Sequence, residues 1–321
     1  MDFAGKLAVV TGGGTGMGRE LVIQLAEAGC SVATCDLNAD NVAETKRRAH
    51  EGASSDVKIS THMCDVSDEA AMLVFRDEVL AEHGRDYINL LFNNAGIGGG
   101  GSFVAGDRGE WERTFAVDWG GVYNGCRAFV PLLLASDEGH LINTSSVNGF
   151  WASLGPGVPH TAYSSAKFAV KGFSEALLED FRINAPHVNV SVVMPGHIGT
   201  DIVINSRVIL GNDPETMSAD EIKATRQSMA LRGMPIDGVS DEDLVKMVAM
   251  MGEMFRNTAP TSAAQAATVI LDGVKAKQWR ILIGDDARKL DEAVRANPEG
   301  AYGPGGLSLA SILDVASGDA G

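Results

Sequence analysis

The sequence Leu7-Ala-Val-Val-Thr-Gly-Gly-Gly-Thr-Gly-Met-Gly18 decides the fold. Its first four residues form a short apolar run that is typical of a buried parallel strand. Apolar residues then recur with helical period as far as Gly29, a residue type that often ends a helix. Strand, glycine turn and helix therefore follow one another in the order that a nucleotide-binding site requires.

The glycines of this turn predict how a phosphate group would be bound. Without side chains the backbone can turn sharply and approach a pyrophosphate, and the next helix directs free N–H groups at the anion. A glycine cluster alone is usually just a loop, but the flanking strand and helix favour a nucleotide site. The candidate phosphate-binding residues are Gly12, Thr15, Gly16, Met17 and Gly18.

A carboxylate at the end of the next apolar run, Asp36, predicts the choice of cofactor. An acid at this distance after a glycine turn accepts hydrogen bonds from an adenosine ribose, and it repels a 2′-phosphate. Neither Thr15 nor Leu37 beside it is basic, which favours NAD(H) over NADP(H). NADP(H) is not excluded, because three arginines could reach the same place: Arg19, Arg47 and Arg48.

Strand and helix patterns continue to alternate along the chain, which predicts an α/β fold with a doubly wound, Rossmann-like parallel sheet and helices on both faces. Further strands are expected at 57–63, 88–92, 141–143, 188–193 and 280–283. Helices are expected at 39–50, at 67–82 with Ser67 as cap, from the capping box Asp107 to Glu110 through Leu132, from Ser262 through Val274, and at 290–296. Residues 1–321 are expected to form one domain, because no linker or repeat interrupts the pattern.

Polar and small residues stand where several of these strands end. Asp65 and Val66 follow one strand, and Asp65 could accept a hydrogen bond from an adenine amino group or be a solvated turn carboxylate. Asn93-Asn-Ala-Gly96 follows another, and its small residues would let a cofactor approach closely. The glycines at 98–101 are also typical of a flexible connector.

The candidate chemistry lies in Tyr163 and Lys167. A spacing of four puts both side chains on one face of a helix, where the ammonium would lower the pKa of the phenol and make it a usable proton carrier. Alone the pair is weak evidence, because two such residues on a solvated helix are common. A hydroxyl at an earlier strand end, Ser146, would face the same cavity, although a serine near a turn is usually structural.

Taken in order, these motifs resemble those of the short-chain dehydrogenase/reductase family. The matching residues are the glycine turn, Asp36, Asp65, Asn93 to Gly96, Ser146, Tyr163 with Lys167, and Pro195-Gly-His-Ile-Gly-Thr200. The resemblance covers residues 1 to about 202 and resumes weakly at 261–284. Its overall look is that of the longer bacterial alcohol dehydrogenases of that family.

The resemblance implies a role for each of these residues. Tyr163 would exchange a proton with the substrate oxygen, Lys167 would lower its pKa and hold the nicotinamide ribose, and Ser146 would hydrogen-bond the carbonyl or alcohol. The remaining implied cofactor contacts are Asn93, Ala95, Gly96, Pro195, Gly196, Ile198 through its backbone, and Thr200.

The chain departs from the family pattern at two places. Asp118 stands where the family usually places an asparagine of the proton relay, and aspartate adds a charge beside Lys167. We expect Asp118 to take the relay role. The segment between Ser146 and Tyr163 is also longer than usual, and it predicts one wall of a roomy substrate cavity or, alternatively, a surface hairpin.

The last third predicts an insertion and a tail. Residues 201–260 show methionines at helical spacing, which predicts a helical lid over the substrate, although methionine stripes are usually core. The Gly- and Ala-rich residues 298–321 are expected to form an arm or a subunit contact.

Composition limits the partners. The 26 basic and 42 acidic residues give a formal charge of −16, which argues against nucleic acid and anionic membranes. No apolar run approaches the length of a membrane span and the N-terminus lacks the pattern of a signal peptide, so a cytoplasmic location is expected. The four cysteines lack metal-site spacing, and we expect buried thiols with neither a metal site nor disulfides.

The sequence therefore predicts an NAD(H)-dependent oxidoreductase that interconverts a bulky, hydrophobic secondary alcohol and a ketone. The alternative is an NAD(H)-binding regulatory protein without turnover, which Asp118 favours. The partner would be a small-molecule substrate, and the resemblance implies a homodimer or homotetramer.

Overall fold

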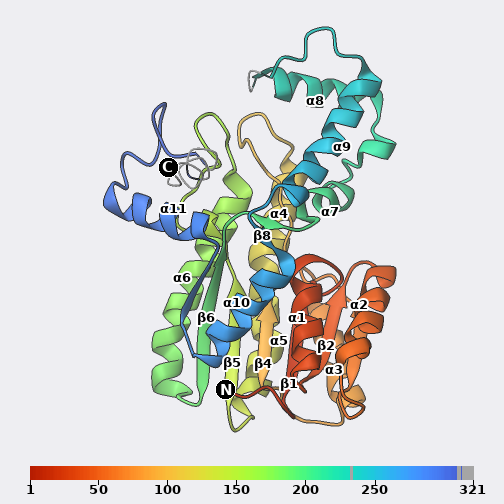
Figure 1. Cartoon of the computed structure of the whole chain (residues 1–321), viewed down its shortest axis with the longest axis vertical. Helices are drawn as coiled ribbons and strands as arrows, with labels where there is room; N and C mark the ends of the chain where they lie inside the picture. Colours follow the sequence, from red (N-terminus) through yellow and green to blue (C-terminus); the bar gives the residue numbers. More distant parts are fainter. Residues whose placement is uncertain (232–233, 309–311, 313–321) are drawn as a thin grey trace, which may run out of the picture.

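A parallel sheet of seven strands lies at the centre of the computed structural model, which describes residues 1–231, 234–308 and 312 (Figure 1). Its strands are β1 (Leu7–Thr11), β2 (Ser31–Asp36), β3 (Ile59–Met63), β4 (Leu90–Asn93), β5 (Gly139–Thr144), β6 (Val188–Pro195) and β9 (Arg280–Ile283). They are ordered β3-β2-β1-β4-β5-β6-β9, and each pairs with its neighbours in parallel. The predicted doubly wound Rossmann-like fold is confirmed.

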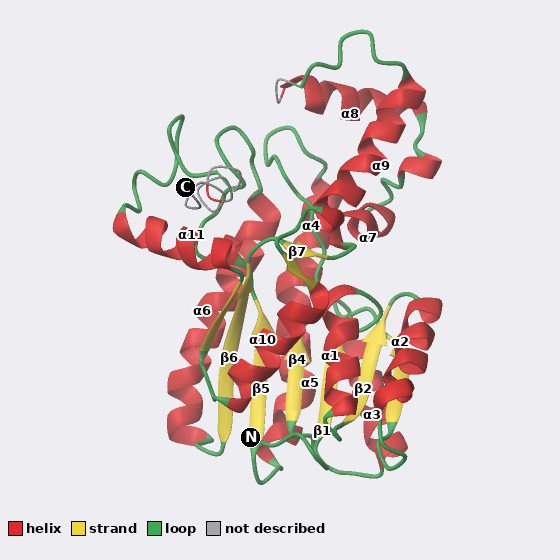
Figure 2. Ribbon diagram, viewed as in Figure 1, coloured by secondary structure: helices red, strands yellow, loops and turns green. Residues whose placement is uncertain are grey.

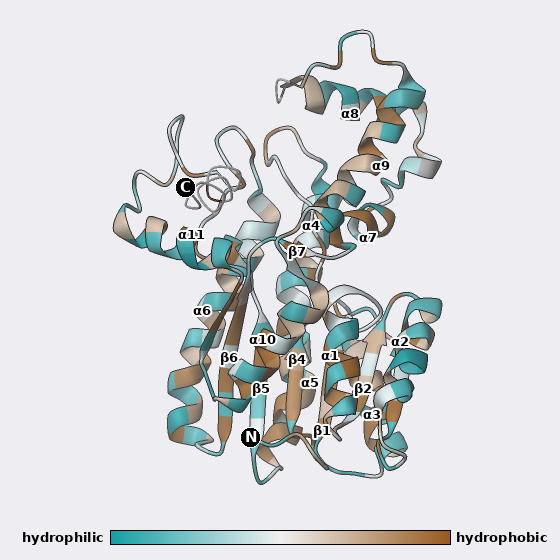
Figure 3. Cartoon of the chain, viewed as in Figure 1, coloured by the Kyte–Doolittle hydropathy of each residue, from teal (hydrophilic) through white to brown (hydrophobic). Residues whose placement is uncertain are grey.

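Helices cover both faces of this sheet (Figure 2). One face packs against α1 (Gly16–Glu27), α2 (Ala39–Gly52) and α10 (Ala263–Lys275), and the other against α3 (Glu69–His83), α5 (Gly121–Leu134) and α6 (Thr161–Asn184). Figure 3 shows the apolar colour concentrated on the strands, which are buried on both sides. Because the chain reverses direction across the sheet between β1 and β4, the carboxyl ends of these two strands border a crevice.

Helix caps agree with the sequence in most places. Asp107 accepts a hydrogen bond from the Glu110 N–H at the start of α4 (Arg108–Phe115), and Ser262 forms the expected capping box with Gln265. The prediction for α3 was wrong by one residue, because Asp68 and not Ser67 caps it. The Ser67 hydroxyl instead donates to Asp65.

Two helix boundaries also differ from the prediction. The long helix is interrupted by a π-helical segment, η1 (Ala116–Gly120), between α4 and α5. The last helix, α11 (Asp285–Ala296), begins five residues before the predicted start at Leu290, because Gly284 with φ +95° turns the chain directly out of β9.

The segment after β6 is helical, as predicted. It contains a short two-stranded pair, β7 (Ile198–Gly199) with β8 (Thr261–Ser262), and the helices α7 (Ile202–Ile209), η3 (Pro214–Thr216), α8 (Ala219–Leu231) and α9 (Asp241–Asn257). α8 and α9 project away from the sheet (Figure 1) around a small core of Met229, Ile236, Leu244 and Val248. Met250 and Met254 remain 59% exposed, so the methionines are only partly core. A lid function for this insertion stays a prediction.

Residues of the C-terminal segment pack against the same chain. The Trp151 indole N–H donates to the Ala301 carbonyl at 3.2 Å, and the Tyr302 hydroxyl accepts from the Ala152 N–H at 3.0 Å. Ile312 is buried in the same cluster. Of the predicted arm at 298–321, residues 309–311 and 313–321 lie outside the described residues.

The four cysteines are buried thiols, as expected: Cys30, Cys35, Cys64 and Cys126. Across residues 1–231, 234–308 and 312, none of the helices combines the length and the apolar character that crossing a bilayer requires.

Candidate active site

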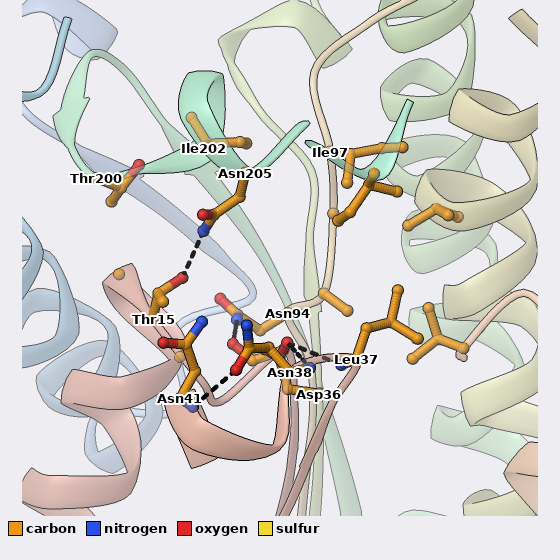
Figure 4. Close-up of a pocket in the computed structure, with 18 of the residues that line it drawn as sticks. Thr15, Asp36, Leu37, Asn38, Asn41, Asn94, Ile97, Thr200, Ile202 and Asn205 are labelled. Atoms are coloured by element: carbon orange, nitrogen blue, oxygen red, sulfur yellow. Dashed lines mark hydrogen bonds between the residues drawn. The ribbon is translucent and has the colours of Figure 1, made fainter. Parts of the chain in front are cut away.

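A cavity of about 370 Å³ opens at the carboxyl ends of β1, β2 and β4 (Figure 4). Eleven of the predicted cofactor-binding residues line it: Gly12, Thr15, Gly16, Met17, Gly18, Asp36, Asp65, Val66, Ala95, Gly96 and Thr200. They come from five separate segments of the chain, and the parallel sheet brings them together because each follows a strand that ends at the same edge.

The glycine turn has no room for side chains. A Cβ at Gly18 would lie 2.0 Å from the Gly12 carbonyl oxygen, and a Cβ at Gly12 would lie 2.7 Å from Ala95 Cα. Gly12 also has φ +66°, where other residues are strained. The glycines thus let α1 begin directly over the end of β1, with its first N–H groups at the cavity.

Asp36 lies in the cavity with its carboxylate held by backbone amides. One oxygen accepts from the Gly14 N–H at 2.9 Å, and the other accepts from Leu37 and Asn38. Three backbone N–H groups therefore fix the orientation of this carboxylate at the cavity.

The arginines that could have neutralised this charge are engaged elsewhere. Arg19 donates to the Gly14 carbonyl and to Thr45, while Arg47 and Arg48 pair with Glu44. None of the three is among the residues that line the cavity.

Asp65 also lines the cavity, where it is ion-paired. The Arg113 guanidinium lies 2.8 Å from one carboxylate oxygen, and Ser67 donates to the other. Burial raises the pKa of Asp65, but the hydrogen bonds from Arg113 and Ser67 outweigh it and keep the pKa below its usual value. Asp65 is therefore ionised at neutral pH and already partly satisfied within the fold.

The two asparagines that follow β4 have different positions. The Asn93 amide donates to Asn143 Oδ1 at 2.9 Å inside the sheet, so this side chain does not line the cavity. The Asn94 amide donates to the Thr11 carbonyl at 3.1 Å and does line it. Sequence reasoning placed the motif correctly but singled out Asn93, because the alternation of side chains at a strand end cannot be read from sequence alone.

Three residues of the Pro195 to Thr200 turn lie away from the cavity. Gly196 donates its N–H to the Ile283 carbonyl, and a Cβ there would lie 2.2 Å from the Asp286 carboxylate. Ile198 pairs with Thr261 in the small sheet, and Pro195 ends β6. Only Thr200 of this predicted set lines the cavity.

Several lining residues were missed by sequence reasoning. Asn38 and Asn41 lie beside Asp36, and their nearness to it in sequence could have indicated them. Ile202, Asn205, Val208 and Ile209 belong to α7, which crosses the cavity; no sequence signal places this helix there.

Tyr163 and Lys167 share one face of α6, as predicted. The Lys167 ammonium lies 5.3 Å from the centre of the Tyr163 ring and donates to the Thr144 carbonyl at 3.2 Å. Ser146 is close enough to Tyr163 to lower the pKa of the phenol, and its hydroxyl accepts the Asn148 N–H. The three predicted catalytic side chains are therefore brought together.

Asp118 forms a buried ion pair with Lys167. Its carboxylate oxygen lies 2.9 Å from the ammonium, and the Asp118 side chain is fully buried. Burial raises the pKa of Asp118 to about 6, although Lys167 pulls it down. The π-helical turn η1 carries Asp118 and places it on the same side as α6.

The cavity and the catalytic cluster meet at Gly96. A Cβ there would lie 2.6 Å from the Asp118 carboxylate and 3.3 Å from the Lys167 ammonium. Because Gly96 lines the cavity, the ion pair lies directly behind its wall.

The pKa of Tyr163 differs from the simple expectation. Burial raises it and the Asp118 charge adds to that, while Lys167 and the Ser146 hydrogen bond lower it. The net direction is upward. Lys167 acts as expected, but its counter-ion cancels much of its effect.

Gly96→Ala is expected to destabilise the fold by about 1–2 kcal/mol, because the added methyl group must push the Asp118–Lys167 pair apart. Urea unfolding would measure the change. Gly172→Ala is the matched control: it lies in the middle of α6 with no atom near the new Cβ, and it should be neutral or slightly stabilising. Equal effects of the two substitutions would contradict the prediction.

The segment between Ser146 and Tyr163 is not a surface hairpin. After a short 3₁₀ turn, η2 (Val147–Gly149), it runs under the C-terminal segment, and Trp151 is fully buried in a cluster with Ala287 and Leu290. It contains no paired strands, and a role as one wall of the substrate cavity stays a prediction.

Comparisons with known proteins agree with this geometry. The short chain dehydrogenase family model matches residues 6–208. SadH of Mycobacterium tuberculosis, whose name describes an oxidoreductase, is 33% identical over 295 residues, which cover 92% of this chain and 91% of SadH. Human epidermal retinol dehydrogenase 2 is 32% identical over 201 residues, 62% of each chain. A short-chain dehydrogenase/reductase from Burkholderia phymatum, solved in complex with NAD, superposes with a TM-score of 0.69 at 25% identity, covering 92% of both chains.

Proposed function

The chain belongs to the short-chain dehydrogenase/reductase family of oxidoreductases, and from this premise we propose that it uses NAD(H) to interconvert a bulky, hydrophobic secondary alcohol and the corresponding ketone. One observation carries the proposal. The Lys167 ammonium, which faces the Tyr163 ring, lies immediately behind Gly96, and Gly96 lines the cavity at the carboxyl ends of the strands.

Each residue of the cluster has a definite task in this reaction. Tyr163 accepts the proton of the alcohol during oxidation and returns it to the ketone oxygen during reduction. Ser146 hydrogen-bonds the same oxygen, which stabilises the charge that develops on it. Lys167 favours the phenolate through its charge, and the bound nicotinamide accepts or donates the hydride.

Apolar side chains support a hydrophobic substrate. Those that line the cavity include Ile97 and Val117, and Ile202, Val208 and Ile209 of α7. A relative that shares a third of its matched residues is named for retinol, a large apolar alcohol. The same proposal includes assembly as a homodimer or homotetramer, which the exposed Tyr123 and Phe168 on α5 and α6 favour.

The test is turnover. The purified protein should change the absorbance of the reduced cofactor when it is given NAD(H) and a panel of aryl and alicyclic secondary alcohols and ketones. Small, polar alcohols in the same panel should be poor substrates. No turnover with either cofactor across the panel would contradict the proposal.

A preference for NAD(H) follows from the arrangement around Asp36. The fixed carboxylate repels a 2′-phosphate, and the arginines near it are engaged. Asp36→Asn is expected to reduce the preference for NAD, measured as kcat/KM with NAD divided by kcat/KM with NADP, at least about 10-fold. The substitution removes the repulsion between the carboxylate and the 2′-phosphate of NADP, while the amide keeps an acceptor oxygen. Asp40→Asn, an exposed acid on α2 that is not among the lining residues, is the matched control. An unchanged ratio for Asp36→Asn would argue against this role.

A regulatory protein that binds NAD(H) without turnover is the second candidate. The Asp118–Lys167 pair favours it. The Asp118 carboxylate offsets the charge of Lys167, so Lys167 lowers the pKa of Tyr163 less than it would alone. Cofactor binding detected by fluorescence, together with no turnover across the panel, would identify it.

A further inference from the structure

α7 crosses the cavity and is tied to both of the loops that border it. The Asn205 amide donates to Thr15 Oγ1 at 3.0 Å, as Figure 4 shows. On the next residue, Ser206 Oγ accepts the Gly98 N–H at 2.7 Å. Two consecutive residues of one helix thus bridge from the glycine turn to the loop that follows β4.

Thr15 is the N-cap residue of α1, yet its side chain makes no capping hydrogen bond. An N-cap threonine usually accepts from a backbone N–H of the first turn. Here its hydroxyl accepts from Asn205, and the first N–H groups of α1 stay available to an anion. Asn205 therefore lies directly opposite the place where the glycine turn would hold a phosphate.

The charges around the cavity make a neutral donor important there. The described residues that line it include no lysine and no arginine, but they include Asp36 and Asp65. Arg19, on the first turn of α1, donates to the Gly14 carbonyl and Thr45, while Arg113 and Lys167 are paired with Asp65 and Asp118. A diphosphate in this cavity has to be held by N–H and O–H donors.

Few side-chain donors are available for this task. The Asn94 amide is engaged by the carbonyl oxygens of Thr11 and Gly12. The partner of Asn205 is a hydroxyl, which can be exchanged for a charged acceptor at a gain in strength.

We propose that Asn205 is a pyrophosphate-binding residue: its amide leaves Thr15 and donates to the diphosphate of the dinucleotide, which holds α7 across the bound cofactor. This inference rests on the proposed use of NAD(H). According to this proposal, the diphosphate rather than the nicotinamide holds α7 in place over the cofactor.

Binding of cofactor fragments by calorimetry tests the proposal, with adenosine, ADP and NAD as probes. Asn205→Ala should raise the Kd for ADP and for NAD about 5- to 10-fold, because one charge-assisted hydrogen bond is lost. It should leave the Kd for adenosine within twofold. Asn205→Asp, which has the same shape, should weaken ADP and NAD about 100-fold, and the loss should shrink at high salt.

Controls separate the possible failures. Asn212→Ala, just beyond α7 and not among the lining residues, should bind all three probes as the unaltered protein does. If Asn205→Ala weakened the binding of adenosine and of ADP equally, the proposal would be overturned in favour of a purely structural role. Weaker binding of NAD together with unchanged binding of ADP would overturn the proposal in favour of a contact at the nicotinamide end. If the unaltered protein bound neither ADP nor NAD, the proposed function itself would fail.

Discussion

Tyr163→Phe is expected to lower kcat by at least about 10³-fold and to leave the Kd for NAD within about twofold. The substitution removes only the hydroxyl, so the ring still stacks on His160 and still faces the Lys167 ammonium. General acid–base catalysis contributes about 10²- to 10⁴-fold, and the substrate oxygen also loses a hydrogen bond that strengthens in the transition state. Steady-state kinetics and cofactor titration would measure the two effects.

Tyr123→Phe provides the matched control for this substitution. Tyr123 lies on α5 and is 44% exposed, so loss of its hydroxyl should change neither turnover nor cofactor binding. Turnover by Tyr163→Phe within tenfold of the unaltered protein would mean that another group transfers the proton. The proposed chemistry would then be wrong even if the protein is a dehydrogenase.

Asp118→Asn is expected to move the pH profile of alcohol oxidation to lower pH by about one to two units. The Asp118 charge raises the pKa of Tyr163, and it offsets the ammonium of Lys167 at 2.9 Å. Asparagine keeps the shape and removes the charge, and a unit charge several ångströms away in a protein interior is worth about 2–3 kcal/mol. The substituted enzyme should thus hold more phenolate at neutral pH and oxidise alcohols about 10- to 100-fold faster there.

The measurement is log kcat/KM against pH for both proteins. A profile that moves to higher pH, or activity lost at every pH, would contradict the expectation. Asp180→Asn, an exposed acid near the end of α6, should leave the profile in place.

The stability of the fold should also depend on the protonation of Asp118. The pKa of Asp118 is about 6 in the fold against a usual 3.8, so between these values the folded protein binds more protons than the unfolded chain. The free energy of unfolding contributed by this group is therefore greatest at low pH and falls as pH rises toward about 6. Urea unfolding across pH 4–6 should show this contribution in the unaltered protein and lack it in Asp118→Asn.

Sequence reasoning was most successful where local pattern and topology coincide. The apolar runs and the glycine turn predicted the sheet, because strands buried on both faces leave a continuous apolar signature. Once the sheet was known, every residue that follows β1, β2 or β4 had to lie at one edge, which placed Gly12, Asp36 and Gly96 together. The spacing of Tyr163 and Lys167 likewise determined that they share a helix face.

What the sequence did not predict depends on contacts between distant segments. No pattern in the neighbouring sequence indicates that Asn205 donates a hydrogen bond to Thr15, or that buried Trp151 donates one to Ala301. The charge of Asp118 was visible, but its effect on Tyr163 depends on burial, which reversed the net direction of the pKa. Such effects require the positions of all three groups at once.

The contact between Trp151 and Ala301 has a consequence for the order of assembly during synthesis. Strands β1, β2, β3 and β4 can begin to pair early in synthesis, because β1, β2 and β3 pair only within this group and β4 alone also pairs with a later strand, β5. The loop that follows Ser146 gains its hydrogen bonds to residues 301 and 302 only about 150 residues later. A nascent chain would therefore bind nucleotide well before it could react with an alcohol, and ribosome-stalled intermediates should show the first property without the second.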